Sequence, residues 1–343
     1  MSRRLAMNVG VVPVAVVAVA GGGYLAISAL VYDRMSRIEA RCGGRFADFT
    51  PASFDAKGFP LDTAPYRMPV FDEVSFPSRD PGITLRAWWV PAEDEAAEGE
   101  AASASIVASQ VAARAPAVIL VHGHGACRRD PVVLLPAGML HRNGFSVLLL
   151  DLRDHGDSTI EDGRHAGGSE EYRDLLGAWD WLRVEKGIGA EQIGAWGASM
   201  GAATALIAAA EEPGLAAVWA DSSFADAMIA ARDELARKGY PTFLAPGGLW
   251  IGRLISGDDL LSRSPLRAAG RLRDRPVFLT HGAADGRMNV HHTLDLAQAL
   301  ARRGADWEIW VVPGAGHVEA MFLHPDGYEQ KLAGFFRAHL GPR

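Results

Sequence analysis

The stretch from Gln192 to Ala210 constrains the fold of this chain more than any other part of the sequence. It begins Gln-Ile-Gly-Ala-Trp-Gly-Ala-Ser-Met-Gly and continues as an alanine-rich run, which predicts a short apolar strand, a sharp turn and a helix. At the turn, Gly197-Ala-Ser-Met-Gly201 fits the pattern G-x-S-x-G. Glycines two positions before and after Ser199 allow a strand and a helix to pass close together, so Ser199 is expected to stand at the N-terminus of that helix.

Strands and helices are predicted to alternate along most of the chain. Two alternating runs, 70–76 and 83–90, flank Ser78-Arg-Asp-Pro-Gly82 and predict a β-hairpin. Further strands are expected at 117–121, 145–150, before Ser199, 216–220, 276–280 and 307–312, and helices at 131–143, 169–186, 290–303 and 327–339. Apolar strands joined by helices predict an α/β fold with a mostly parallel, eight-stranded sheet covered on both faces. A longer insert, residues 224–267, is expected to form a small helical cap.

The N-terminus carries a long uncharged run. No charged residue occurs from Leu5 to Tyr32, and Arg3 and Arg4 precede the run. Because a helix of about 20 residues crosses a bilayer, we expect a single-pass, uncleaved transmembrane signal anchor over residues 1–33 and a juxtamembrane connector over 34–69. The alternative is a signal peptide cleaved near Ala20. Basic residues on the two sides of the run nearly balance, which gives only a weak preference for the main domain, 70–343, outside the cytoplasm.

Charge and cysteine content limit the kinds of partner and the kind of fold that this chain can have. The formal net charge is −7 and no basic stripe with interleaved aromatics occurs, so no nucleic-acid partner is expected. The only cysteines, Cys42 and Cys127, do not make a disulfide framework, and Cys127 is expected to be a small buried side chain rather than a reactive thiol. The acidic run within 92–115 predicts a solvated loop.

Polar residues follow several of the predicted strands. Ser199 follows one strand, Asp221 the next, Asp285 comes shortly after the seventh and His317 after the last. Because the carboxyl ends of parallel strands meet at one edge of a sheet, these side chains are expected to lie close together. The chain thus supplies a serine, an acid and a histidine in that order, with Asp221 competing with Asp285 for the role of the acid.

Five signatures occur in order: His122-Gly123, Asp-x-Arg-x-His-Gly-x-Ser at 151–158, G-x-S-x-G, His-Gly-x-x-Asp at 281–285, and Gly316-His317. With them, the chain from Val70 to Leu340 resembles the α/β-hydrolase superfamily. Within it, the modest insert and the sequence Trp310-Val-Val-Pro-Gly-Ala-Gly-His-Val-Glu319 are similar to Bem46/YqkD-like hydrolases. This branch is grouped with serine-aminopeptidase-like hydrolases, and its members are often membrane-anchored.

The resemblance implies a catalytic triad and an oxyanion hole. Ser199 would be the nucleophile, His317 the base and Asp285 the acid, while the backbone N–H groups of His124 and Met200 would stabilise the oxyanion. No cofactor is implied. The expected activity is that of a carboxylesterase- or lipase-like enzyme that cleaves an ester or thioester through an acyl-serine. A peptidase or amidase of the same fold, and a catalytically silent membrane-tethered scaffold, are the alternatives.

The cap supplies candidate substrate-binding residues, Tyr240, Phe243 and Trp250. They are as consistent with simple packing of the cap onto the sheet as with an acyl pocket.

Other polar motifs have alternative interpretations. His122-x-His124 continues as Gly125-Ala-Cys-Arg128 rather than as Asp-His, which disfavours a metal pair. His291 and His292 open a helix, where adjacent side chains face different ways, so no metal is expected there either. Within 151–158, Asp151 and Arg153 are expected to fix a turn, catalysis by His155 is a minor alternative, and Asp154 stands where the family usually has glycine.

Overall fold

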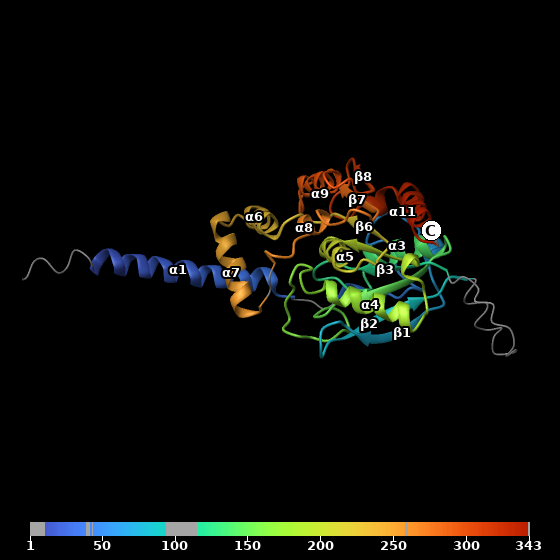
Figure 1. Ribbon diagram of the computed structural model, residues 1–343, viewed down its shortest axis with the longest axis horizontal. Coiled ribbons are helices and arrows are strands. Elements are labelled where there is room, and N and C mark those ends of the chain that lie inside the picture. The colour runs from blue at the N-terminus through green and yellow to red at the C-terminus, as the bar shows by residue number, and fades with distance from the viewer. Residues whose placement is uncertain (1–10, 39–41, 43, 94–114, 258–259, 342–343) are drawn as a thin grey trace, which may run out of the picture.

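A computed structural model describes residues 11–38, 42, 44–93, 115–257 and 260–341, so most of the predicted acidic loop lies outside the described residues. Eight strands form one sheet in the order β1-β2-β4-β3-β5-β6-β7-β8 (Figure 1). Their bounds are β1 (Asp72–Pro77), β2 (Thr84–Val90), β3 (Ala117–Val121), β4 (Ser146–Asp151), β5 (Ile193–Ala198), β6 (Ala217–Asp221), β7 (Val277–Gly282) and β8 (Trp307–Val312). Strand β2 runs antiparallel to β1 and β4, and the other pairs are parallel. The predicted mostly parallel, eight-stranded sheet is therefore confirmed.

Helices cover both faces of this sheet. One face packs against α4 (Tyr172–Val184), α5 (Met200–Glu211), α8 (Pro265–Ala269) and α9 (His291–Ala301). The other packs against α3 (Pro131–His141), α10 (Ala320–Leu323) and α11 (Pro325–His339). The residues of the central strands β3 to β7 are buried, as expected for strands that read as continuous apolar runs.

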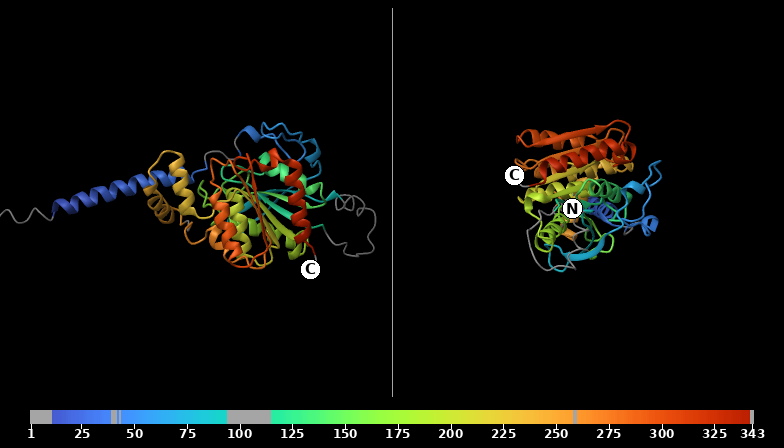
Figure 2. Two further views of the ribbon diagram at one scale, coloured as in Figure 1. Left: turned by 90° about the horizontal axis from the view of Figure 1, so that it is seen from above. Right: turned by 90° about the vertical axis from the view of Figure 1, so that its right-hand side faces the viewer.

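The insert between β6 and β7 forms the cap. It contains α6 (Ala227–Arg237), a short 3₁₀ turn (Thr242–Leu244) and α7 (Ala245–Ile255). Because the cap leaves the carboxyl end of β6, it starts at the same edge of the sheet as Ser199. Helix α1 (Val11–Ser36) passes beside α7, and its N-terminal part extends away from the sheet (Figures 1 and 2).

The predicted transmembrane anchor gains no support from the described residues. None of the helices in the described ranges combines the length and the hydropathy of a membrane span. Residues 5–10 of the uncharged run lie outside those ranges. From Tyr24 onward, α1 contacts the cap, so this half of the expected anchor packs on the folded domain.

The expected juxtamembrane connector is also part of the domain. Phe54, Tyr66 and Met68 are buried in the cluster that covers α3. A Cβ atom on Gly138 would overlap the carbonyl oxygen of Tyr66, so glycine at this position lets the connector lie directly on α3. The connector contains two short 3₁₀ helices, Gly44–Phe46 and Ala64–Tyr66, and Pro65 lies within the second.

A disulfide joins the connector to the loop after β3. Cys42 and Cys127 are bonded, with their Cα atoms 4.9 Å apart. Cys127 is buried as expected, but the interpretation of it as a lone small side chain is wrong. The separation of 85 residues hid the pairing, because only the folded connector brings Cys42 to this loop.

Candidate active site

Ser199 lies at a sharp turn between β5 and α5. Its backbone has φ 55° and ψ −116°, a conformation that non-glycine residues rarely adopt and that typically costs about 1–3 kcal/mol. A Cβ atom on Gly197 would overlap the backbone of Gly201, and one on Gly201 would overlap the carbonyl oxygen of Val121. Both glycines are therefore required by the close approach of β3, β5 and α5, as the sequence pattern indicated.

Ser199, His317 and Asp285 meet at the carboxyl edge of the sheet. In His317, Nε2 lies 3.0 Å from Oγ of Ser199, and Nδ1 lies 2.7 Å from Oδ2 of Asp285. A Cβ atom on Gly282, at the end of β7, would overlap the carbonyl oxygens of Ala315 and Gly316. Glycine there lets the loop that carries His317 lie against the end of β7, close to Asp285.

The Asp285 carboxylate is held in its charged form. Burial is the strongest influence on its pKa and raises it. The hydrogen bond with His317 and the N–H groups of Arg287 and Met288, each 2.8 Å from Oδ1, outweigh burial and leave the pKa of Asp285 below its usual value. A negative charge therefore faces Nδ1 of His317 at neutral pH.

Asp221, the competing acid, belongs to a separate buried network. Its carboxylate accepts hydrogen bonds from the Tyr328 hydroxyl at 2.8 Å and the Ser222 hydroxyl at 2.9 Å. Burial raises the pKa of Asp221 to about 6. The Ser222 Oγ atom in turn accepts the N–H of Val318 at 3.3 Å, so Asp221 acts on the backbone beside His317. Sequence analysis missed Ser222 and Tyr328, and only the Asp221-Ser222 pair after β6 offered a signal.

The expected oxyanion donors lie on two segments beside Ser199. Met200 begins α5, and the first N–H groups of a helix have no partner within the helix. A Cβ atom on Gly123 would lie 3.2 Å from Cβ of Ser199, so the loop that carries His124 passes next to the serine. The His124 ring packs 4.2 Å from that of His165, and burial lowers the pKa of His124 to about 3. This imidazole is therefore neutral at pH 7.

His122 and His155 have structural roles. Nδ1 of His122 donates to the carbonyl of Gly123, while its Nε2 accepts the N–H of Leu152. His155 likewise donates to the carbonyl of Arg153 and accepts from a backbone N–H. Burial lowers the pKa of both rings. With both ring nitrogens used by the backbone, neither histidine has a free position for a proton or a metal.

The structure shows how an aspartate is accommodated at position 154. Its φ is 61°, in the left-handed region that normally favours glycine. Its Oδ1 atom accepts the N–H groups of Glu161, Asp162 and Gly163 at 2.8, 3.2 and 2.8 Å. These three hydrogen bonds compensate for the strained backbone and order the loop after β4.

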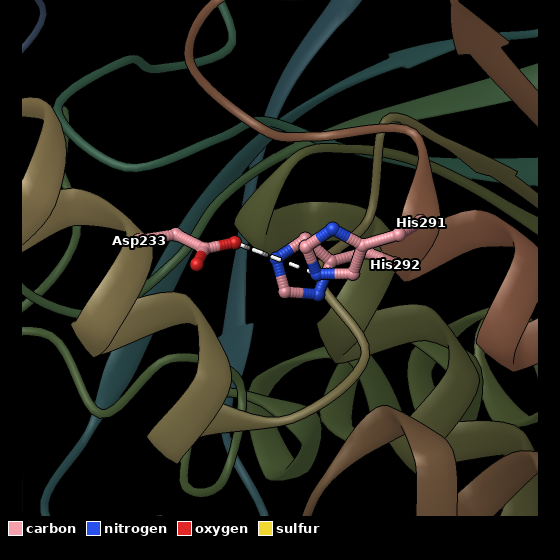
Figure 3. A group of neighbouring side chains, drawn as sticks. All are labelled: Asp233, His291 and His292. Carbon is pink, nitrogen blue, oxygen red and sulfur yellow. Dashed lines mark ion pairs between the residues drawn. The ribbon is translucent and has the colours of Figure 1, made fainter.

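Asp233, His291 and His292 connect the cap to the sheet domain (Figure 3). The expectation that the two imidazoles face different ways is wrong, because their rings lie 4.3 Å apart and both Nε2 atoms approach Oδ2 of Asp233, at 3.4 and 3.3 Å. The N–H of Ala225 donates to Nδ1 of His292, so the neutral ring carries its proton on Nε2, facing the carboxylate. Burial lowers the pKa of His292 to about 4, so the ring is neutral at pH 7, and the arrangement suits a polar contact between α6 and α9 better than a metal ligand.

The candidate pocket residues lie on the outer surface of the cap. Tyr240, Phe243 and Trp250 are 52%, 64% and 60% exposed, so they line no buried acyl pocket. For Trp250 the reason lies in α7, where Gly247, Gly248 and Gly252 contact α1. Leu249 on the same helix is buried, whereas Trp250, Leu254 and Ile255 are directed outward.

Strand order, the serine turn after β5 and the three converging side chains define an α/β-hydrolase fold. The structure is similar to the esterase Pf2001 of Pyrococcus furiosus, with a TM-score of 0.60 and 22% identity over 82% of this chain and 95% of that one. It is also similar to the acylaminoacyl peptidase of Pyrococcus horikoshii, with a TM-score of 0.57 and 19% identity over 79% of this chain and 41% of that one. Residues 136–343 match the model of the prolyl oligopeptidase family, peptidase S9. The chain belongs to this family.

Curated relatives match shorter regions. The thiohydrolase AneE of Aspergillus aculeatus is 36% identical over 97 residues, which cover 28% of this chain and 30% of that protein. An uncharacterised 31.7 kDa protein of Escherichia coli is 29% identical over 132 residues, covering 38% of this chain and 45% of that protein. The matched region thus spans less than half the length of either relative. The Bem46/YqkD-like branch stays a sequence-based prediction.

Proposed function

We propose that this protein is a serine hydrolase that cleaves carboxylic ester or thioester bonds through an acyl-serine intermediate. The observation that carries the proposal is the continuous contact from Oγ of Ser199 through the imidazole of His317 to the carboxylate of Asp285, at 3.0 and 2.7 Å. A serine hydroxyl is a weak nucleophile at neutral pH, and this arrangement supplies the base that it needs.

Each group has one task in the proposed mechanism. Oγ of Ser199 attacks the carbonyl carbon while Nε2 of His317 takes its proton, and Asp285 stabilises the imidazolium that forms. The N–H groups of His124 and Met200 would donate to the oxyanion, and His317 then protonates the leaving alcohol or thiol. Water, deprotonated by the same histidine, releases the acyl group and restores Ser199.

The class of substrate is supported by the relatives. A thiohydrolase shares 36% identity over 97 residues with this chain, and an esterase has a similar fold. A peptidase or amidase is the second candidate, favoured by membership of the prolyl oligopeptidase family. A silent scaffold is the third, but all three side chains that the chemistry requires are present.

A pair of serine variants tests the chemistry. A fluorophosphonate probe is expected to label the full chain and the control Ser223→Ala, but not Ser199→Ala. Turnover of short-chain nitrophenyl esters should fall to background in Ser199→Ala alone, and parallel assays with aminoacyl anilides separate an esterase from a peptidase. Undiminished turnover in Ser199→Ala would refute the proposal. Folded native protein that the fluorophosphonate does not label would favour the catalytically silent scaffold.

We also propose a single-pass membrane attachment with the catalytic domain outside the cytoplasm. The uncharged run from Leu5 to Tyr32 supports attachment. The disulfide between Cys42 and Cys127 supports the location, since such bonds persist mainly in oxidising compartments.

A further inference from the structure

Exposed apolar side chains are concentrated on one part of the molecule. Thirteen large hydrophobic side chains are exposed among the described residues, and eight of them belong to α1 or to the cap segment 240–255. Soluble domains rarely expose such a concentration unless it binds a partner. We call these eight residues the cap surface: Leu25, Ile27, Leu30, Tyr240, Phe243, Trp250, Leu254 and Ile255.

A glycine face on α7 joins the two halves of the cap surface. Gly247, Gly248 and Gly252 contact α1, and a Cβ atom on Gly252 would lie 2.7 Å from the ring of Tyr32. The Tyr24 hydroxyl accepts the N–H of Gly247 at 3.1 Å and donates to the carbonyl of Phe243 at 3.0 Å. The cap and α1 therefore form one packed unit, although more than 200 residues separate them in sequence.

This packing determines which side chains of α7 face outward. Its small residues contact α1, whereas Trp250 and Leu254 are 60% and 72% exposed. Other apolar side chains of the cap, Leu235, Leu244 and Leu249, are buried. The cap therefore has a packed inner side and a separate exposed apolar side that an apolar partner would cover.

The cap surface carries types of side chain that are found where proteins meet a lipid bilayer. Tyr240 and Trp250 have an apolar ring with a polar tip, the kind of side chain that is enriched where membrane meets water. Arg232 on α6 and Arg253 on α7 are exposed, and their charge suits anionic headgroups.

The direction of α1 also favours a lipid bilayer as the partner of the cap surface. From the cap surface, α1 extends away from the sheet (Figure 2), and the sequence preceding Tyr32 contains no charge back to Leu5. A second copy of the chain would also cover an apolar face, but it would not account for this uncharged continuation.

We propose that the cap surface lies in the interface of a lipid bilayer, with α1 and α7 contacting the membrane together. This inference rests on the proposed membrane attachment and is independent of the proposed ester chemistry. It places the edge of the sheet that carries Ser199 on the membrane side of the domain, because the cap leaves that edge.

An environment-sensitive label tests the contact directly. Both native cysteines are in the disulfide, so Trp250→Cys in the full chain offers a single thiol for bimane. Val184→Cys is the matched control, because Val184 is 76% exposed and lies on α4, in the sheet domain. With vesicles of phosphatidylcholine and phosphatidylglycerol, bimane at 250 should shift to shorter wavelength and lose most of its emission to nitroxide-labelled lipids, while bimane at 184 should change little.

The outcomes separate the proposals. Vesicle-bound protein whose label at 250 stays in water overturns the inference but leaves membrane attachment standing. Protein that does not bind vesicles overturns both. A blue shift that appears without vesicles and grows with protein concentration assigns the surface to a second copy and also overturns the inference. Leu254→Cys repeats the measurement, and Ser199→Ala in the same background should bind vesicles unchanged.

Discussion

Two neighbouring aspartates make a sharp test of the site, because only one of them contacts His317. We predict that Asp285→Asn lowers kcat/KM for a nitrophenyl ester by about 10⁴, whereas Asp221→Asn lowers it by less than about 10-fold. Both substitutions preserve shape and remove a carboxylate that is buried near the same histidine.

The magnitudes follow from the contacts. Asp285 lies 2.7 Å from Nδ1 of His317, and an asparagine there loses the charge that stabilises the imidazolium and favours the wrong tautomer. A loss of about 10⁴ corresponds to about 5.5 kcal/mol of transition-state stabilisation. The hydrogen-bonded path from Asp221 to the loop runs through Ser222 and the N–H of Val318, and its charge acts on His317 without direct contact, so an asparagine there weakens about one hydrogen bond, worth about 1 kcal/mol.

Steady-state kinetics at pH 8 measure both effects, and thermal unfolding of each variant verifies that the fold is retained. An Asp221→Asn variant that loses more activity than Asp285→Asn, with both proteins folded, would show that the acid has been assigned to the wrong residue. Equal losses would show that the two carboxylates act as one unit.

Two further predictions concern stability and compartment. Burial raises the pKa of Asp221 to about 6, above the value near 3.8 in the unfolded chain, so the native state favours the protonated form. The resulting contribution to the free energy of unfolding is fully present below about pH 4 and disappears as the pH rises through 6. It amounts to about 3 kcal/mol. Chemical unfolding of Asp221→Asn from pH 4 to pH 8 should therefore lose less stability than the native chain loses, and identical pH profiles would contradict the network. In protein taken from cells and unfolded in denaturant, Cys42 and Cys127 should resist alkylation until a reductant is added, whereas Cys127 should react at once in the control Cys42→Ser. Free thiols in the native chain under the same conditions would argue against an oxidising compartment.

The sequence was informative wherever a local rule determined the geometry. The glycines around Ser199 are required by steric contact, and the apolar runs could only be central strands of a covered sheet. The polar residues at the strand ends then had to meet at one edge, which is why Ser199, Asp285 and His317 were found. Contacts between residues far apart in the sequence could not be predicted. Asp221 and Asp285 both follow strands, and only the register of the His317 loop decides between them.

Other features depended on segments that fold onto distant parts of the chain. The disulfide requires the connector to reach the loop after β3, and no short motif marks that path. The apolar cap residues were expected either to line a pocket or to pack the cap onto the sheet, because apolar side chains usually face inward. On α7 the outward direction of Trp250 follows from the contact with α1, which Gly247 and Gly248 allow because they carry no side chain.

The packing of α1 against the domain has a consequence for N-terminal truncation of this protein. Its last turns are fastened to the loop after β4, where Arg164 contacts Asp33 and the N–H of His165 bonds the carbonyl of Ser36. Trimming the N-terminus to obtain a freely soluble enzyme would uncover the glycines of α7 and leave Arg164 unmatched. The last turns of α1 are thus part of the folded domain, and removing them alters the loop after β4, whose His165 packs against His124 beside Ser199.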